Sequence, residues 1–351
     1  MKEKFSQRAS ILILSLWSLM FLSIIAVYSG VMVRQEITAR EKIASRNKLY
    51  DVAYSGIMMA MDLVNSPKMR DATPGFDSLN DFWADSPYLF KNVRFPDGAC
   101  TLLYDYNNNF SGLKELKYGV VDEERKVNIN YVNKDVIKRL LVFIGGLEDT
   151  EGAYVANAIV DWHDSDDILY NDERNLSEAA DYMNSGYDYT PKNTHFALLE
   201  ELLLVKGMNR DIFFAIKDYI TVFSNGLINI NTVSQRILLT YGLGYQSAEM
   251  ITSFRAGADM KEGTSDDNLF VSATRILETL SSYYDIPEAV RVEIVALVNS
   301  EVLAVESQTF TAVCQSSLSE QDMIGRIMCV FERSGRIKYW GCGYDRMEEL
   351  S

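Results

Sequence analysis

The sequence predicts an α+β protein with a long N-terminal helix, an antiparallel sheet built from both chain ends, and a large inserted helical domain. Three observations predict this class. An uncharged apolar run lies near the start of the chain, strand-like alternation occurs before residue 130 and returns after residue 306, and the periodicity between these regions is mostly helical. A chain of 351 residues is long enough for about two globular units.

The composition excludes several classes of protein. Lys and Arg total 34 against 49 Asp and Glu, which gives a net charge of −15, and 48% of the residues are hydrophobic. This balance excludes a disordered chain and a polytopic membrane protein. It also argues against a protein that mainly grips nucleic acid, because phosphate binding requires a positive surface.

The first element is a membrane anchor. Residues 1–10 carry three basic residues against one acid, and residues 11–33 carry no charge at all. At 1.5 Å per residue this run spans about 35 Å, enough to cross a hydrocarbon core of ~30 Å. The basic flank places the N-terminus in the cytoplasm and the bulk of the chain outside. A secretory signal peptide is the alternative, but its apolar run is only about 7–15 residues long.

The anchor is expected to continue as a helix on a soluble domain. After a polar collar, apolar residues recur every seven positions: Ile43, Tyr50, Ile57 and Val64. This spacing gives one apolar stripe on a helix, and Pro67 supplies a stop. We therefore predict a single helix from residue 11 to about residue 64, half in lipid and half packed on protein.

Strands are expected on both sides of a helical insert. Alternating apolar and polar residues predict strands at 92–105, 116–130, 307–316, 325–333 and 336–342. Ser334-Gly335 is a two-residue hairpin signal between the last two strands. The sheet domain is thus expected to consist of residues 34–130 and 306–351, with a helical domain at 131–305 inserted between them.

The inserted domain contains a repeat. VNINYV at 127–132 recurs as ININTV at 228–233, and each copy leads into an amphipathic helix, a glycine pair and a second helix. Asparagine side chains can cap the first N–H groups of a helix, and paired glycines permit a tight hairpin. The pattern is a duplicated helix-hairpin-helix, with a third, weaker version at 198–216.

Helix-hairpin-helix units often bind the DNA backbone, which raises the alternative of a membrane-tethered DNA-binding protein acting during uptake. A helical packing module without a ligand is a further interpretation. Residues 161–188 contain nine acids and a single base, Arg174. Such a field repels a polyanion, so no nucleic acid partner is expected.

The same acidic segment is the one candidate for bound chemistry. Its candidate metal ligands are Asp164, Asp166, Asp167, Asp172, Glu178, Asp181 and Asp188. Hard oxygen ligands in a long loop suit calcium. The segment is not an EF-hand, because Ile168 stands at the third ligand position and the required Gly and closing Glu are missing. A solvated acidic loop is the other interpretation, and the residues alone leave both open.

No catalytic residues are predicted, and the chain is not expected to be an enzyme. His163 and His195 are the only histidines and form no metalloprotease motif. The sequence has no nucleophile elbow, phosphate-binding loop or C-x-x-C pair.

All four cysteines fall in the predicted sheet domain: Cys100, Cys314, Cys329 and Cys342. Export would permit disulfides, and Cys314 and Cys329 can face each other across one loop. Pairing cannot be deduced from sequence, so buried free thiols are an equal alternative.

Four runs behind the anchor carry a specific resemblance: VVDEERKVNIN, IVDWHDSDD, YTPKNTHFALLEELLLVKGM and YITVFSNGLININT. In order and spacing they resemble the general secretion pathway protein K family, the K-type minor pseudopilins of type II secretion. The resemblance implies a pilin-like domain interrupted by a helical domain, anchored in the bacterial inner membrane with its bulk in the periplasm. It further implies a position at the pseudopilus tip, where the chain nucleates assembly with the I- and J-type minor pseudopilins for protein export. Exported proteins and the inner-membrane secretion platform are further candidate partners.

The resemblance also assigns roles to single residues. Prepilin peptidase would cut a leader of residues 1–10 at the junction Ser10–Ile11, although the family usually has Gly where Ser10 stands. Ser15 occupies the fifth mature position, where major pilins carry a Glu that pairs with a neighbouring subunit. A missing carboxylate there suits a terminal subunit. The resemblance finally implies calcium in the inserted domain, held by acids from the set above.

Overall fold

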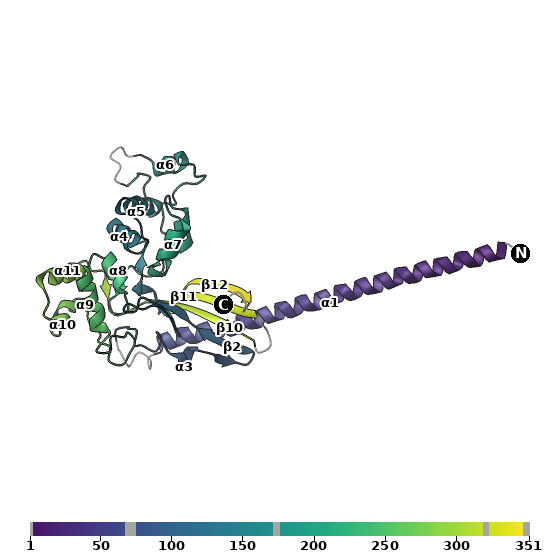
Figure 1. The fold of residues 1–351 in the computed structure, drawn as a ribbon, viewed down its shortest axis with the longest axis horizontal. Helices are drawn as coiled ribbons and strands as arrows, with labels where there is room; N and C mark the ends of the chain where they lie inside the picture. Colours follow the sequence, from purple (N-terminus) through teal and green to yellow (C-terminus); the bar gives the residue numbers. More distant parts are fainter. Residues whose placement is uncertain (1–2, 67–74, 171–175, 319–322, 347–351) are drawn as a thin grey trace.

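The computed structural model describes residues 3–66, 75–170, 176–318 and 323–346 (Figure 1). Its dominant feature is α1 (Glu3–Asn65), one continuous helix of 63 residues. The N-terminal part of α1 projects away from the remainder of the molecule, and all other elements gather around its C-terminal end (Figure 1). From Ile11 onward, α1 is long and apolar enough to cross a membrane by length and composition.

The second half of α1 packs against a sheet. Val52, Ala53, Ile57 and Ala60 are buried in the core of the sheet domain. Ile43 is 59% exposed, so the expected apolar stripe is wrong at its first position. The reason is geometric, since the sheet covers the helix only beyond that point, and Leu49 is the first large apolar residue that is fully buried.

The sheet takes strands from both chain ends, as predicted. Its order is β1-β2-β10-β11-β12, all antiparallel, and β5 also pairs with β10. The strands are β1 (Val93–Phe95), β2 (Gly98–Leu102), β5 (Val121–Asp122), β10 (Thr309–Ser317), β11 (Met323–Glu332) and β12 (Ile337–Arg346). Gly335 takes a positive φ of 87° in the turn between β11 and β12, where the sequence predicts a hairpin. A separate ladder joins β3 (Tyr104–Asn107) and β4 (Lys114–Lys117), and α3 (Pro87–Phe90) precedes β1.

In the order of the chain, two lobes of helices come between the N-terminal and the C-terminal strands of the sheet. They lie beside the sheet and share a hydrophobic core of their own (Figure 1). The first lobe, from β6 to β7, has β6 (Val127–Asn128), α4 (Lys134–Phe143), α5 (Asp149–His163), α6 (Glu178–Asn184), η2 (Leu199–Leu204), α7 (Arg210–Ile216), η3 (Lys217–Tyr219) and β7 (Ile220–Thr221). The second lobe, from β8 to β9, has β8 (Ile228–Asn229), α8 (Gln235–Thr240), α9 (Tyr245–Arg255), α10 (Ile276–Ser281), α11 (Glu288–Asn299) and β9 (Leu303–Ala304).

The sequence repeat corresponds to these lobes. The first and last strands of each lobe pair in parallel with each other, β6 with β7 in the first lobe and β8 with β9 in the second. In each, the first two helices are joined through a glycine of positive φ, Gly146 at 74° and Gly242 at 97°. The α+β class with a sheet built from both chain ends and an inserted helical domain is therefore confirmed.

The asparagines of the repeat have a different role from the predicted one. Asn133 caps α4 and Ser234 caps α8, so the capping role expected of the Asn-x-Asn pairs is wrong. Asn130 instead accepts from the Phe196 backbone N–H at 2.8 Å and donates to its carbonyl at 3.0 Å. Asn231 makes the same two bonds with Phe270, at the same distances. Each buried side-chain amide therefore satisfies both backbone groups of a phenylalanine, as a neighbouring strand would, and so binds a distant segment of its own lobe.

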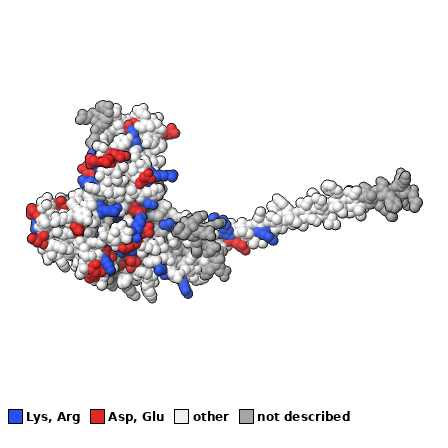
Figure 2. Space-filling view, viewed as in Figure 1, with Lys and Arg blue, Asp and Glu red and all other residues white. Residues whose placement is uncertain are grey.

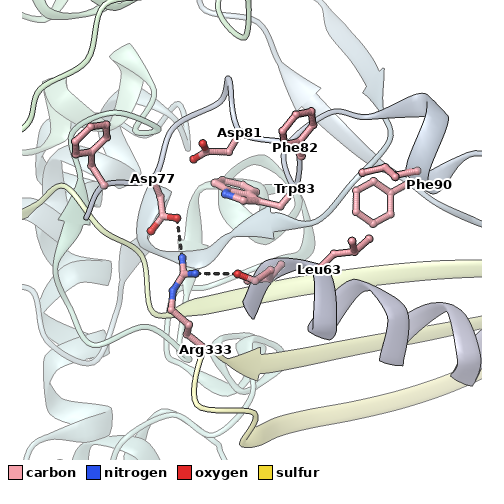
Figure 3. Close-up of a pocket in the computed structure, with 10 residues that line it drawn as sticks. Leu63, Asp77, Asp81, Phe82, Trp83, Phe90 and Arg333 are labelled. Carbon is pink, nitrogen blue, oxygen red and sulfur yellow. Dashed lines mark hydrogen bonds and ion pairs between the residues drawn. The ribbon is translucent and has the colours of Figure 1, made fainter. Parts of the chain in front are cut away.

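Arg333 joins the end of α1 to the loop that follows it and to the segment that leads into β10. Its guanidinium donates to Asp77 at 2.6 Å, to the Val64 carbonyl at 3.0 Å and to the Ser307 carbonyl at 3.1 Å. Figure 3 shows this side chain between Asp77 and the last turn of α1, beside Trp83. The buried pair fixes the point where the chain re-enters the sheet after the second lobe.

Candidate metal centre

Three carboxylates converge where α5 ends and α6 begins. Asp161 lies in the last turn of α5, Asp164 follows the helix directly, and Glu178 is the first residue of α6. One ligand oxygen from each lies within 4.8 Å of the other two. Asp161 is 4% exposed and Glu178 is fully buried. The cluster lies at the end of the first lobe that is farthest from the sheet (Figure 1).

Local packing explains why the helices meet there. Trp162 is buried between Asp161 and His163, and its ring lies against those of Tyr182 and Phe196. This contact holds the end of α5 against α6 and against the segment that Asn130 binds. The carboxylates on either side of the Trp162 contact are thereby brought together at its edge.

The loop between the helices is fixed by other acids. Asp167 accepts from the Ala179 N–H at 3.0 Å and from the Ser177 hydroxyl at 2.8 Å, at the start of α6. These bonds hold the pKa of Asp167 below its ordinary value. Asp166 accepts from the Ile168 N–H at 2.9 Å, which closes a local turn.

The buried carboxylate oxygens of the cluster have few hydrogen-bond partners among the described residues. Asp161 accepts from the Tyr170 N–H at 2.8 Å, but one Asp164 oxygen and both Glu178 oxygens are buried without a hydrogen-bond partner among the described residues. Burial, and then the neighbouring acids, raise the pKa of Glu178 to about 9. Burial raises the pKa of Asp161 to about 7, despite the bond from Tyr170. A divalent cation would relieve both the desolvation and the repulsion.

The structure places the predicted ligands unequally. It brings Asp164 and Glu178 into the cluster, whereas Asp181 forms an ion pair with Lys206 at 2.7 Å. Asp166 and Asp167 hold the loop, Asp188 is exposed, and Asp172 lies outside the described residues. Sequence reasoning left out Asp161. Its signal is the position beside Trp162 on the buried face of α5.

The predicted processing and assembly residues lie on α1. Ile11 and Ser15 are exposed, and the Ser15 hydroxyl donates to the Leu12 carbonyl at 2.8 Å. Ser10 lies within the helix, and its side chain is outside the described residues. Among the residues that Figure 2 colours, the first part of the helix carries no charged residue, and charged residues appear nearer the folded body.

Comparisons with known proteins agree with this architecture. Residues 113–225, which include the first lobe, match the model of the family described as type II secretion system (T2SS), protein K. A chain in the crystal structure of the GspK-GspI-GspJ complex from the type 2 secretion system of enterotoxigenic Escherichia coli matches with a TM-score of 0.57. The two chains share 14% sequence identity, and the match covers 88% of this chain and 99% of that one. No curated protein matches. The resemblance to the K family and the pilin-like fold are confirmed.

Proposed function

We propose that this chain is the K-type minor pseudopilin at the tip of a type II secretion pseudopilus, where it nucleates assembly with the I- and J-type subunits for protein export. One observation carries the proposal. An apolar helix runs without a break into a sheet built from both chain ends, and the two-lobed insert divides that sheet. A chain of the GspK-GspI-GspJ complex shares the fold over 88% of this chain, which supports the proposal.

Two features support a terminal position. The two lobes extend well beyond the sheet and would obstruct a subunit stacked above it (Figure 1). Ser15 offers no carboxylate to neutralise the N-terminus of a neighbouring subunit, and its hydroxyl is already bonded within the helix. The bulk of the chain is then periplasmic, with residues 11–33 in the inner membrane.

The partner helices would pack along α1 between the membrane and the folded body. Ile37 and Ile43 are both more than half exposed in this segment. Apolar residues at such positions suit lateral helix packing. Exported proteins and the inner-membrane platform are further partners under the same proposal.

Complex formation tests the function. The full chain in detergent, mixed with the I- and J-type subunits of the same genome, is expected to elute as one 1:1:1 particle by gel filtration with light scattering. Ile43→Asp should weaken that particle, whereas Tyr88→Asp, at an exposed position on α3, should not. Separate elution of all three would contradict the proposal. Salt-sensitive DNA binding would favour the tethered DNA-binding alternative.

We also propose that Asp161, Asp164 and Glu178 hold calcium, completed by further oxygens from the loop or from water. Calcium accepts six to eight oxygen ligands, and buried carboxylate oxygens without partners supply the charge it requires. Addition of calcium to chelator-treated full chain should raise its melting temperature, and magnesium should do so less. As a control, Asp188→Asn should keep this rise in melting temperature, because that acid lies outside the cluster. An unchanged melting temperature would contradict calcium binding.

Cleavage by prepilin peptidase between Ser10 and Ile11 is a separate proposal. Intact-mass measurement of the chain isolated from membranes should give a species that begins at Ile11. Because the family usually has Gly before the cut, Ser10→Gly should increase the cleaved fraction. A chain that retains its first ten residues in both forms would contradict the assignment.

A further inference from the structure

The four cysteines occupy four adjacent strands of one sheet. Cys100 is on β2, Cys314 on β10, Cys329 on β11 and Cys342 on β12. All four are unpaired thiols in this structure. The first three are buried and Cys342 is exposed. The question is whether any two are placed to form a covalent bond.

Cys100 and Cys314 are diagonal neighbours on the face of the sheet that α1 covers. In the β2–β10 register, Cys100 lies opposite Ser316 and Cys314 lies opposite Leu102, so the two cysteines are one pleat repeat apart. A hydrogen bond from the Cys314 thiol holds the pKa of Cys100 below its ordinary value. The same contact and burial raise the pKa of Cys314. A lowered thiol pKa favours the thiolate form, which is the form that attacks in disulfide exchange.

Gly56 on α1 locates both sulfurs. A Cβ atom at Gly56 would lie 2.6 Å from the Cys100 sulfur and 2.6 Å from the Cys314 sulfur. The two sulfurs therefore lie within twice that distance of each other, directly beneath the helix backbone. A glycine is required at this position, because any side chain would collide with both.

Cys329 is a weaker partner for Cys314. It lies opposite Ala312 on β10 and opposite Trp340 on β12. Burial alone raises the pKa of the Cys329 thiol, without a contribution from another cysteine. Because the two sulfurs that meet beneath Gly56 are those of Cys100 and Cys314, the pairing of Cys314 with Cys329 that the sequence leaves open is less favoured than a pairing with Cys100.

We propose that Cys100 and Cys314 are joined by a disulfide in the mature protein. The bond forms by exchange with a disulfide-carrying oxidant: the Cys100 thiolate attacks the oxidant's disulfide, and Cys314 then displaces the oxidant's sulfur. One S–S bond forms in the chain and one breaks in the oxidant, which takes up two electrons and two protons as two thiols. The inference depends on the proposed periplasmic location, because such oxidants act outside the cytoplasm.

The bond would connect the two halves of the sheet domain. Cys100 precedes the first lobe and Cys314 follows the second, so the closed loop contains the whole helical insert. Because both sulfurs are covered by α1 at Gly56, exchange must be complete before this helix packs. The cross-link then holds β2 against β10 even if the helical insert unfolds.

Thiol mapping on the full chain tests the proposal. Cells are quenched with acid, the precipitated protein is dissolved in neutral denaturant that contains the alkylating agent, and the isolated chain is digested without reductant. The expected result is two alkylated cysteines, Cys329 and Cys342, and one linked peptide pair containing Cys100 and Cys314. Cys329→Ser should preserve the linked pair and Cys314→Ser should abolish it. Four alkylated cysteines, or a link to Cys329, would overturn the proposal.

The exposed thiol of Cys342 separates this inference from the question of location. A membrane-impermeant maleimide applied to spheroplasts should label Cys342 if the bulk of the chain is periplasmic. Labelling of Cys342 together with free Cys100 and Cys314 would overturn the disulfide and leave the location intact. If Cys342 reacts only after lysis, the location is wrong, and refolding of the full chain in a glutathione redox buffer decides the chemistry. Formation of the same link there supports the pairing, and its failure overturns it.

Discussion

The two lobes of the inserted domain share a frame and differ in how they neutralise buried acids. Both begin with an Asn-x-Asn strand whose second asparagine binds a phenylalanine backbone with the same two hydrogen bonds. The second lobe then buries Glu262 against Arg255, side chains that are 4% and 3% exposed. The first lobe instead buries Asp161 and Glu178 beside Asp164, with no cation from the described chain among them.

The two lobes differ in the source of the positive charge that their buried acids require. Arg255 also donates to the Ile230 and Val233 carbonyls, so the positive charge of the second lobe is part of its fold. Glu262 in turn accepts from Tyr106 and Asn109 of the sheet domain and so joins the lobe to the sheet. Under the calcium proposal, a cation from solution would supply the charge that the first lobe lacks. One duplicated frame would then provide a fixed support in one copy and a cation site in the other.

Replacement of the buried arginine of the second lobe, Arg255, should give the largest loss of stability. Arg255→Met leaves Glu262 buried without its partner and should cost about 3–5 kcal/mol of unfolding free energy. Urea unfolding measures this cost. Arg275→Met is the control, because that arginine is exposed in the same lobe and its ion pair with Glu278 should contribute less than about 1 kcal/mol. Equal costs for the two variants would remove the distinction between the lobes.

The shared frame predicts matched losses. Asn130→Ala and Asn231→Ala each leave a buried Phe N–H and carbonyl unpaired, and each should cost about 2–4 kcal/mol. Thermal unfolding of the two single variants should give similar shifts. A much smaller loss for one of them would mean that the lobes are not equivalent at this position.

The ligand site should give an effect whose sign depends on calcium. In chelator, burial raises the pKa of Glu178 to about 9, so Glu178→Gln removes the cost of protonating a buried acid and should leave the protein as stable as the wild type or about 1 kcal/mol more stable. At calcium one hundred times above the dissociation constant, the wild type should gain about 2.7 kcal/mol that the variant lacks. Calorimetry in both buffers checks the crossing. A variant that is destabilised equally in both would point to a purely structural role for Glu178.

Acid should distinguish the second lobe by the smallest effect. Although burial opposes it, Arg255 and the bonds from Tyr106 and Asn109 hold the pKa of Glu262 below its ordinary value. The resulting stability is present above the ordinary carboxyl pKa and is lost as the pH falls through the lowered one, by at most about 1.4 kcal/mol per pH unit. Urea unfolding of wild type and Glu262→Gln at pH 7, 5 and 4 should give a constant difference at the first two values and a smaller one at pH 4.

The sequence predicts local periodicity well and distant partners poorly. The end of α1, the strands on both sides of the insert and the turn at Gly335 follow from repeats of 3.6 and 2 residues and from turn chemistry. The bonds of Asn130 to Phe196 do not, because periodicity identifies the face that a residue occupies but not the segment that packs against it. The capping role expected of that asparagine is wrong for this reason.

The candidate metal centre follows the same rule. Asp164 and Glu178 are identifiable as members of an acidic segment, but Asp161 belongs to a helix whose inward face is apolar. Only the packing of Trp162 brings it to the other two. The disposition of the cysteines is similarly invisible in the sequence, since Cys100 and Cys314 meet through a strand pairing across the entire insert.

The unbroken course of α1 makes the orientation of the folded body depend on residue count. From the end of the apolar run at Val33 to Ala44, the helix has no break and every residue is exposed. Each residue of an α-helix advances about 1.5 Å and turns about 100°. A single inserted residue in this stretch would therefore rotate the entire body by more than a quarter turn about the helix axis, and a full heptad would nearly restore it. The length of this segment sets an angular phase, and any neighbour that packs beside it must match that phase.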